Sequence, residues 1–264
     1  MRKLICGVAF VMAASAASIT WAQGPGIVDP VRPVAANIYL CTLNAGKTMA
    51  DFDAAQQMWL NAAEEGEHNG ITFRLTPRYG NIPFDLVWID YLPFDQLAQS
   101  SEWWDNNGQA AIAAILDAVS CRSSLNTNRL DYLNEALPED GTAFFLWNWC
   151  TPREGVTGAA VAASRREFVQ RLSDLGVRGA SSRMFPFLGS RNRLGQFADM
   201  FVSPDWNAIA AYHEYEANGG WRLTADYNDN VAQCIGTNVY DLTVLNLPHT
   251  PWACLLYTSP SPRD

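Results

Sequence analysis

Two short stretches of the sequence begin like catalytic motifs, and neither completes its pattern. His213-Glu214-Tyr215-Glu216-Ala217 starts as a zinc-binding His-Glu-x-x-His helix, but alanine stands where the second histidine must be. Ala45-Gly46-Lys47-Thr48 ends like a phosphate-binding loop, but that loop requires glycine at position 41, which is Cys41. Three histidines in the whole chain give little support to a Ser-His-Asp arrangement. The sequence therefore predicts no metal site, and it assigns no catalytic residues.

The side chains suited to binding a small molecule are aromatic ones, together with two arginines. Concave, largely apolar sites with a few polar groups are typical of small-molecule binding. We expect such a site on a strand and the following helix in each half of the chain, with an arginine facing an anionic group unless a structural ion pair occupies it. The predicted ligand-binding residues are Trp88, Tyr91, Trp206, Tyr212, His213, Arg74 and Arg183. The alternative for each aromatic residue is a place in the core, where we expect Trp59.

Tryptophan and histidine positions add three expectations. Trp103 and Trp104 have no tryptophan pair as counterpart in the second half, and such asymmetry is where one copy of a duplication can specialise. His68 lies in the polar stretch "EEGEHNG", for which a solvated histidine is expected. His213 has aromatic neighbours on a predicted helix, and a satisfied or exposed surface histidine is expected there.

The chain repeats itself at an offset of 109 residues. "RLTPRYG" at 74–80 and "RMFPFLG" at 183–189 share Arg-x-x-Pro-x-x-Gly, and "CTLNAGKT" at 41–48 matches "CTPREGVT" at 150–157. This indicates internal duplication. In both copies we expect Arg-x-x-Pro-x-x-Gly to end a strand, with proline terminating the strand and glycine allowing the chain to reverse its direction. Because both halves keep the arginine, a structural role explains it more easily than a single reaction centre.

Each copy is predicted to have the order β-α-β-β-α-β. Runs of β-branched and aromatic residues predict the strands, and Thr48 and Thr157 stand where helix N-caps belong. Asp51 then supplies the acid of a capping box. The expected strands are 36–43, 71–75, 84–92 and about 127–133, then 143–150, 181–185, 196–203 and 238–245.

This order, found twice, is the ferredoxin-like pattern, and two such units resemble the dimeric α/β-barrel superfamily over about residues 35–246. In architecture the chain is similar to the antibiotic-biosynthesis-monooxygenase and stress-response barrel groups. The resemblance implies an α+β fold in which two tandem ferredoxin-like repeats form a pseudo-dimeric α/β barrel, with two sheets packed face to face. The predicted organisation is a signal peptide (1–22), a linker (23–34), repeat 1 (35–134), a linker (135–141), repeat 2 (142–246) and a tail (247–264). Residues 254–264 resemble translated adapter sequence and stay outside the fold prediction.

Four cysteines remain between the leader and the tail, two in each copy. Four cysteines allow three pairings, and a metal site is the alternative, although the chain has no Cys-x-x-Cys and no matched histidine. In a ferredoxin-like sheet the first and fourth strands are antiparallel neighbours. The repeat therefore favours pairing within each unit, Cys41 with Cys121 and Cys150 with Cys234.

Charge and leader composition indicate the compartment and exclude some partners. The start "MRKLICGVAF" has the basic residues and apolar run of a secretory signal, so we expect a periplasmic or secreted protein without a transmembrane segment. Removing Arg2 and Lys3 with that leader takes the formal net charge from −9 to −11, which argues against nucleic acid as a partner. The function predicted is binding of a small apolar or aromatic molecule, anionic ones included, or of a partner protein. We predict that the protein has no cofactor. Some tandem barrels of the resembled architecture hold haem in one half, so the resemblance implies an alternative with haem bound at His213. The alternative function is then a cofactor-free or haem-assisted oxidoreductase or isomerase of the barrel type.

Overall fold

The computed structural model describes residues 26–27, 33–66, 68–134, 141–189 and 196–247. The predicted signal peptide, most of both predicted linkers and residues 254–264 lie outside the described residues. Within the described part, no helix combines the length and the hydropathy that crossing a bilayer requires.

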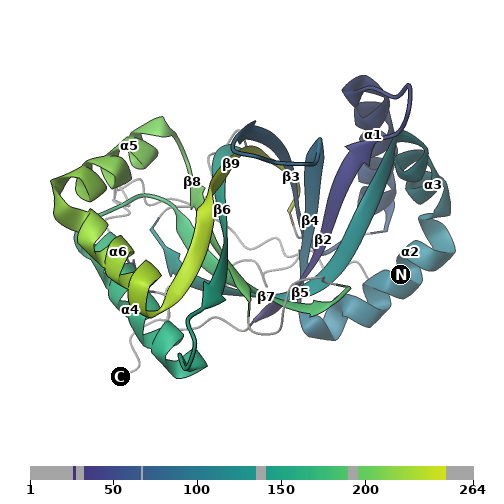
Figure 1. The fold of residues 1–264 in the computed structure, drawn as a ribbon. Helices are drawn as coiled ribbons and strands as arrows, with labels where there is room; N and C mark the ends of the chain where they lie inside the picture. The colour runs from purple at the N-terminus through teal and green to yellow at the C-terminus, as the bar shows by residue number, and fades with distance from the viewer. Residues whose placement is uncertain (1–25, 28–32, 67, 135–140, 190–195, 248–264) are drawn as a thin grey trace, which may run out of the picture.

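The predicted element order is present in both halves of the chain (Figure 1). The first half consists of β2 (Val34–Leu43), α1 (Met49–Glu65), β3 (Ile71–Tyr79), β4 (Leu86–Leu92), the short helix η1 (Phe94–Gln96), α2 (Leu97–Asn107), α3 (Gln109–Ala118) and β5 (Val119–Leu133). The second consists of β6 (Thr142–Pro152), α4 (Gly158–Asp174), β7 (Ala180–Leu188), β8 (Phe197–Ser203), α5 (Trp206–Tyr215), η2 (Glu216–Gly220), α6 (Trp221–Asn230) and β9 (Ala232–Asn246). A two-residue strand, β1 (Gly26–Ile27), pairs with β5.

The eight long strands form one closed antiparallel barrel. Each repeat contributes a four-stranded sheet, β5-β2-β4-β3 from the first and β9-β6-β8-β7 from the second. Hydrogen bonding between β3 and β9 and between β5 and β7 joins the sheets at both edges. The sequence predicted two sheets facing each other, and the structure adds that their edges also pair. Closure leaves none of these eight strands with an exposed edge.

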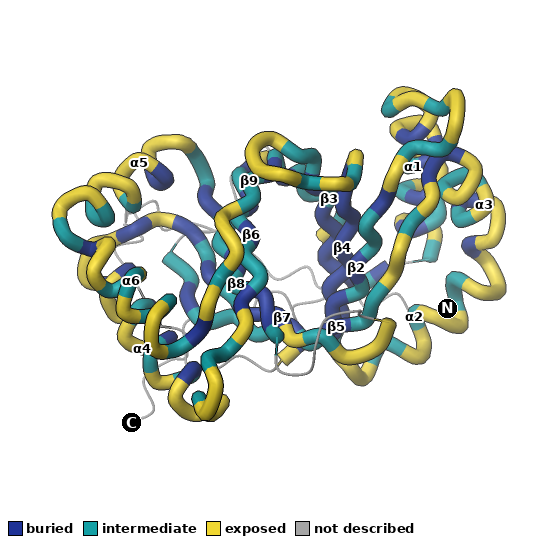
Figure 2. Tube along the Cα trace, in the orientation of Figure 1, coloured by how far each residue is buried: buried dark blue, intermediate teal, exposed yellow. Residues whose placement is uncertain are grey.

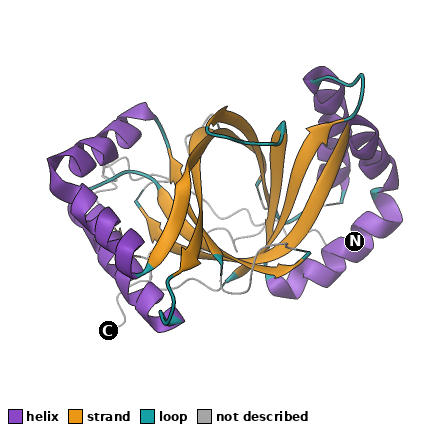
Figure 3. Cartoon of the chain, in the orientation of Figure 1, coloured by secondary structure: helices purple, strands orange, loops and turns teal. Residues whose placement is uncertain are grey.

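Apolar side chains fill the barrel, and helices cover its outside. The interior cluster comes from alternate residues of β2, β3, β4, β6, β7, β8 and β9, as the period of two in a strand requires. Figure 2 shows these buried positions along the central strands, and Figure 3 shows the helices of each repeat on the outer face of its own sheet. The space within the barrel is therefore core, and the outer faces under the helices are where the repeats differ.

The helix caps agree with the sequence prediction. Thr48 accepts a hydrogen bond from the backbone of Asp51, whose carboxylate accepts one in return from Thr48, and this completes the capping box of α1. Thr157 accepts from the backbone of Ala160 at the start of α4. These caps fix where α1 and α4 leave their strands, and so how the helices lie over the sheets.

The repeated motif behaves partly as predicted. Gly80 and Gly189 end β3 and β7 with positive φ angles of 119° and 71°. The prediction that proline stops the strand was wrong, because Pro77 and Pro186 lie within β3 and β7. Each proline lies beyond the last pairing with one neighbouring strand, where only the other neighbour remains. A missing N–H costs little at such a position.

Both predicted disulfides are present. Cys41 and Cys121 are direct register partners on β2 and β5, and Cys150 and Cys234 are partners on β6 and β9. The Cα atoms of each bonded pair are 4.0 Å apart. Each bridge thus ties the first strand of a repeat to its last, as the ferredoxin-like order implied.

Candidate functional site

Side chains alternate between two faces of β4, and this separates two residues that the sequence analysis placed in one site. Trp88 points to the outer face, where it packs with Phe52 and Trp59 of α1. Tyr91 points into the barrel, where it packs with Phe73 of β3. Residues three apart in a strand face opposite sides. Trp88 and Tyr91 therefore do not share a wall.

Each repeat has a cavity between the outer face of its sheet and its helices. The first-repeat cavity, of about 470 Å³, lies between β2, β4 and β5 on one side and α1, α2 and α3 on the other. The second-repeat cavity, of about 200 Å³, lies between the sheet of that repeat and α4, α5 and α6. Aromatic residues of the first lining are Tyr39, Phe52, Trp59, His68, Trp88 and Trp104. Polar residues of the second include Asn148, Arg165, Asp199, Asp226 and Tyr227.

Three tryptophans and a histidine meet at the first-repeat cavity. Trp59 of α1 stacks on Trp104 of α2, with ring centroids 5.2 Å apart and planes 10° apart. Trp88 meets Trp59 edge-on at 4.8 Å. His68 meets Trp59 and Trp104 edge-on at 5.4 and 5.9 Å, and it is buried, so the expectation of a solvated His68 was wrong. Trp59 is a core residue as predicted, and it also lines the cavity.

A carboxylate is buried beside these rings. Asp90 Oδ1 accepts hydrogen bonds from Thr72 Oγ1 at 2.7 Å and from Trp88 Nε1 at 3.2 Å. Burial raises the pKa of Asp90 to about 6, and the two hydrogen bonds oppose that rise. Burial also raises the pKa of Tyr39, and the nearby charge of Asp90 adds to the effect. Asp90 is thus an acid that titrates near neutral pH in the wall of an aromatic cavity.

The two repeat arginines make structural ion pairs. Arg74 Nη1 donates to Asp53 Oδ1 at 2.6 Å and to Gln56 Oε1 at 3.0 Å, both on α1. Arg183 donates from Nε and Nη2 to the two carboxylate oxygens of Asp131 at 2.7 and 2.8 Å. Neither arginine lines either cavity. The sequence analysis expected an arginine to face an anionic ligand only if no structural ion pair occupied it. Both arginines are occupied by such pairs, so neither is available for this role.

The three predicted residues of α5 do not come together at one site. Tyr212 lines the second-repeat cavity. Trp206 is exposed and packs edge-on against Tyr79 at the end of β3. His213 is exposed and belongs to the lining of neither cavity. Of the predicted ligand residues, the structure thus places only Trp88 at the first cavity and only Tyr212 at the second.

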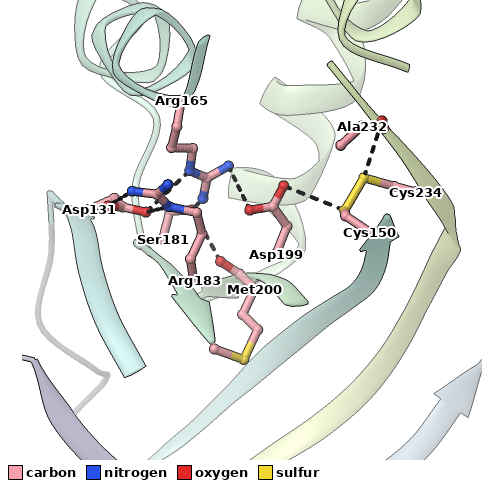
Figure 4. Close-up of polar contacts among 9 residues, drawn as sticks. All are labelled: Asp131, Cys150, Arg165, Ser181, Arg183, Asp199, Met200, Ala232 and Cys234. Carbon is pink, nitrogen blue, oxygen red and sulfur yellow. Dashed lines mark hydrogen bonds and ion pairs between the residues drawn. A yellow bond between two sulfur atoms is a disulfide. The ribbon is translucent and has the colours of Figure 1, made fainter. Parts of the chain in front are cut away.

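A charged network includes Arg165 and Asp199 of the second-repeat cavity lining (Figure 4). Arg165 of α4 reaches Asp131 Oδ2 and Asp199 Oδ1, each at 3.4 Å, and also donates to Ser181 Oγ. Arg183 pairs with the same Asp131. Two arginines and two aspartates therefore neutralise one another on this face of the sheet.

Asp199 and the second disulfide lie close together. One ligand atom from each of Cys150, Cys234 and Asp199 falls within 4.8 Å of the others. Both cysteines are oxidised, and metal binding needs thiolates. The 3.8 Å contact from Cys150 Sγ to Asp199 Oδ2 is no hydrogen bond either, because a disulfide sulfur carries no proton. This cluster is not a metal site while the bridge is intact.

Strand register shows how the two faces have diverged. Trp88 is the register partner of Arg74, and Asp199 is the register partner of Arg183. Since these arginines are equivalent in the repeat, Asp199 holds in the second half the position of Trp88 in the first. One face has become aromatic and the other charged.

Sequence reasoning missed several lining residues, and some left a readable signal. Asp90 lies two residues after Trp88 in a predicted strand, so the two share a face by alternation alone. Trp104 belongs to the tryptophan pair that has no counterpart in the second half of the chain, and this asymmetry was its signal. Tyr39 lines the first-repeat cavity and Arg165 the second, and neither left such a signal. Only the packing of the helices on the sheet brings these two side chains to a cavity.

No protein-family model and no curated protein matches this sequence. Solved structures do resemble it. A candidate monooxygenase of Fusobacterium nucleatum subsp. nucleatum is 15% identical, with a TM-score of 0.53 over 84% of this chain and 94% of that one. A haem-binding protein of Thermus thermophilus is 9% identical, with a TM-score of 0.50 over 84% of this chain and 95% of that one.

A candidate chlorite dismutase is 12% identical, with a TM-score of 0.50 over 85% of this chain and 99% of that one. At these identities the likeness is one of fold, and fold alone assigns no activity. The chain has the fold of the dimeric α/β-barrel proteins, with both halves of the barrel in one polypeptide.

Proposed function

We propose that this protein is an exported binding protein for a small aromatic or apolar molecule, which it holds in the first-repeat cavity. The observation that carries the proposal is the arrangement of Trp59, Trp88 and Trp104 around an open volume of about 470 Å³. Pockets for small molecules are commonly of about 300–1,000 Å³ and mostly apolar, with few polar groups. The two disulfides and the predicted signal peptide support a periplasmic or secreted location.

The polar groups of the cavity limit the ligand further. Asp90 and Asp105 are lining residues, and no arginine or lysine is among those that the structure describes there. An anionic ligand would meet carboxylates without a partner cation. The described lining of the cavity therefore does not favour an anionic ligand.

The described residues do not form the haem site that the alternative from the sequence requires, with His213 as the ligand. His213, the suggested axial ligand, lies outside both cavities. No histidine is among the described lining residues of the second-repeat cavity. In the first, His68 Nε2 lies 2.5 Å from where a Cβ on Gly70 would stand, so this nitrogen faces the backbone at the start of β3.

A second candidate function is proton transfer, as in an isomerase or a cofactor-free oxidoreductase. Asp90 supports it, because a carboxyl group that titrates at about pH 6 within a cavity is poised to exchange protons at neutral pH. Asp90→Asn separates the candidates. It keeps an oxygen that can accept from Thr72 and Trp88, so binding of a neutral aromatic molecule should survive while a reaction that uses this base should not.

Calorimetric titration with indole-3-ethanol, a neutral aromatic probe, tests the binding function. We expect saturable binding and an affinity about tenfold lower in Trp104→Ala, which removes one face of the cavity. Trp221→Ala is the matched control, since Trp221 is exposed on α6 in the other repeat. Equal losses in the two variants, or no saturable binding of this probe and of its charged analogues tryptamine and indole-3-acetate, would show that the cavity is not the site.

A further inference from the structure

The walls of the first-repeat cavity combine negative charge with aromatic faces. Asp90 lies at its floor on β4, and Asp105 belongs to its lining on α2. Trp59, Trp88 and Trp104 surround the same volume. Cations are attracted to the faces of tryptophan rings, and aromatic cages are the usual means of recognising ammonium groups.

Asp90 has polar partners but no cationic one among the described residues that it contacts. Its Oδ1 accepts the hydrogen bonds from both Thr72 and Trp88. Arg74 on the neighbouring strand is engaged by Asp53 and Gln56 instead. A buried carboxylate without a counter-charge is unfavourable, and a cation placed in the cavity would relieve this.

The second repeat shows how the same face looks when its charges are already balanced. There Asp199 pairs with Arg165, and Asp131 of the adjoining strand β5 pairs with both Arg183 and Arg165 (Figure 4). That repeat supplies its own cations from α4 and β7. The first repeat supplies none at Asp90 among the residues that the structure describes there, although its cavity is the larger one.

We propose that the ligand of the first-repeat cavity is an organic cation, a protonated or quaternary amine on an aromatic or apolar body. This rests on the proposed binding function and specifies its ligand class. The ammonium group lies at Asp90, with Oδ2 as its acceptor, and the apolar body lies in the cavity against the tryptophan rings that line it. A protonated amine also donates hydrogen bonds, and charge-assisted bonds of this kind are roughly twice as strong as neutral ones.

Three probes of nearly the same shape test the charge of the ligand. Tryptamine is cationic at pH 7, indole-3-ethanol is neutral and indole-3-acetate is anionic. Calorimetric titrations should rank them in that order, with tryptamine at least about tenfold tighter than indole-3-ethanol. Indole-3-acetate should bind most weakly.

Two isosteric substitutions locate the recognition. Asp90→Asn should lower the affinity for tryptamine about tenfold and leave that for indole-3-ethanol within about twofold. Asp53→Asn is the matched control, because it removes one negative charge from the same repeat at an exposed position outside the cavity. It should leave both affinities within about twofold. Near-ultraviolet circular dichroism would verify that each variant keeps its tertiary packing.

The outcomes separate the two proposals. Equal binding of tryptamine and indole-3-ethanol overturns the cationic ligand and leaves the binding function standing. A preference for tryptamine that survives in Asp90→Asn overturns it as well, since the charge would then be recognised elsewhere. If none of the three probes binds saturably, the binding function itself fails.

Discussion

Asp131 of β5 and Arg183 of β7 form a buried two-point ion pair across the seam between the two repeats. The hydrogen bonds measure 2.7 and 2.8 Å, and the side chains are 10% and 7% exposed. The seam strands β5 and β7 belong to different copies of the duplication. The repeated arginine in this copy therefore helps to hold the barrel closed.

Replacing that arginine should be costly. Arg183→Met removes the main partner of buried Asp131, and breaking a buried pair in this way costs about 3–5 kcal/mol. Arg171→Met is the control, because its contact with Glu167 spans 3.9 Å between half-exposed side chains and should contribute less than about 0.5 kcal/mol. Urea denaturation of both variants measures the difference. Similar losses would mean that the buried pair has no special role.

Stability should depend on pH through Asp90. Its pKa in the folded protein, about 6, lies above the ordinary 3.8, so the folded state binds the proton more tightly than the unfolded state does. Stability from this group is therefore full below about pH 4 and falls as the pH rises through about 6. The loss by about pH 7 is about 3 kcal/mol.

Asp90→Asn, which cannot ionise, isolates this effect. The free energy of unfolding of Asp90→Asn relative to the wild type should rise between about pH 4 and about pH 7 and then level off. Urea denaturation at several pH values gives this difference directly. A constant difference over that range would contradict the raised pKa.

Each disulfide should contribute substantially to stability. The bridges close loops of 80 and 84 residues, for which the chain-entropy model gives about 4 kcal/mol each. The double variant Cys41→Ala, Cys121→Ala should therefore shift the urea midpoint well below that of the wild type without leaving a free thiol. Peptide mapping without reductant should recover both predicted linkages from the wild-type protein. Free thiols at these four positions would contradict the pairing.

Gly80 should be far less tolerant of substitution than Gly46, although both have positive φ. A Cβ on Gly80 would lie only 3.2 Å from the backbone Cα of Asn238 and would force the Asn238 side chain to turn away, whereas one on Gly46 would meet nothing within 4 Å. Gly46→Ala should cost about 1 kcal/mol from backbone strain alone, and Gly80→Ala about 3 kcal/mol. Thermal unfolding of the two variants compares them, and equal shifts would show that contact with β9 is unimportant.

Local pattern and duplication were sufficient to predict much of the architecture. The helix cap at Thr48 depends on neighbours three residues away, so the residues alone indicate it. Cys41 and Cys121 could be paired because both occur twice at matched positions and the strand order makes their strands neighbours. Gly80 could be placed because its conformational freedom is local.

The site depended on contacts that no local pattern contains. Trp88 and Tyr91 looked like one wall until the pleat of β4 assigned them to opposite faces. His68, in a polar stretch, was buried by Trp59 and Trp104 from two different helices. Asp90 became a candidate ligand group because helices fold over its strand and remove it from water, and a carboxylate's pKa and partners are set by what surrounds it in three dimensions rather than by its neighbours along the chain.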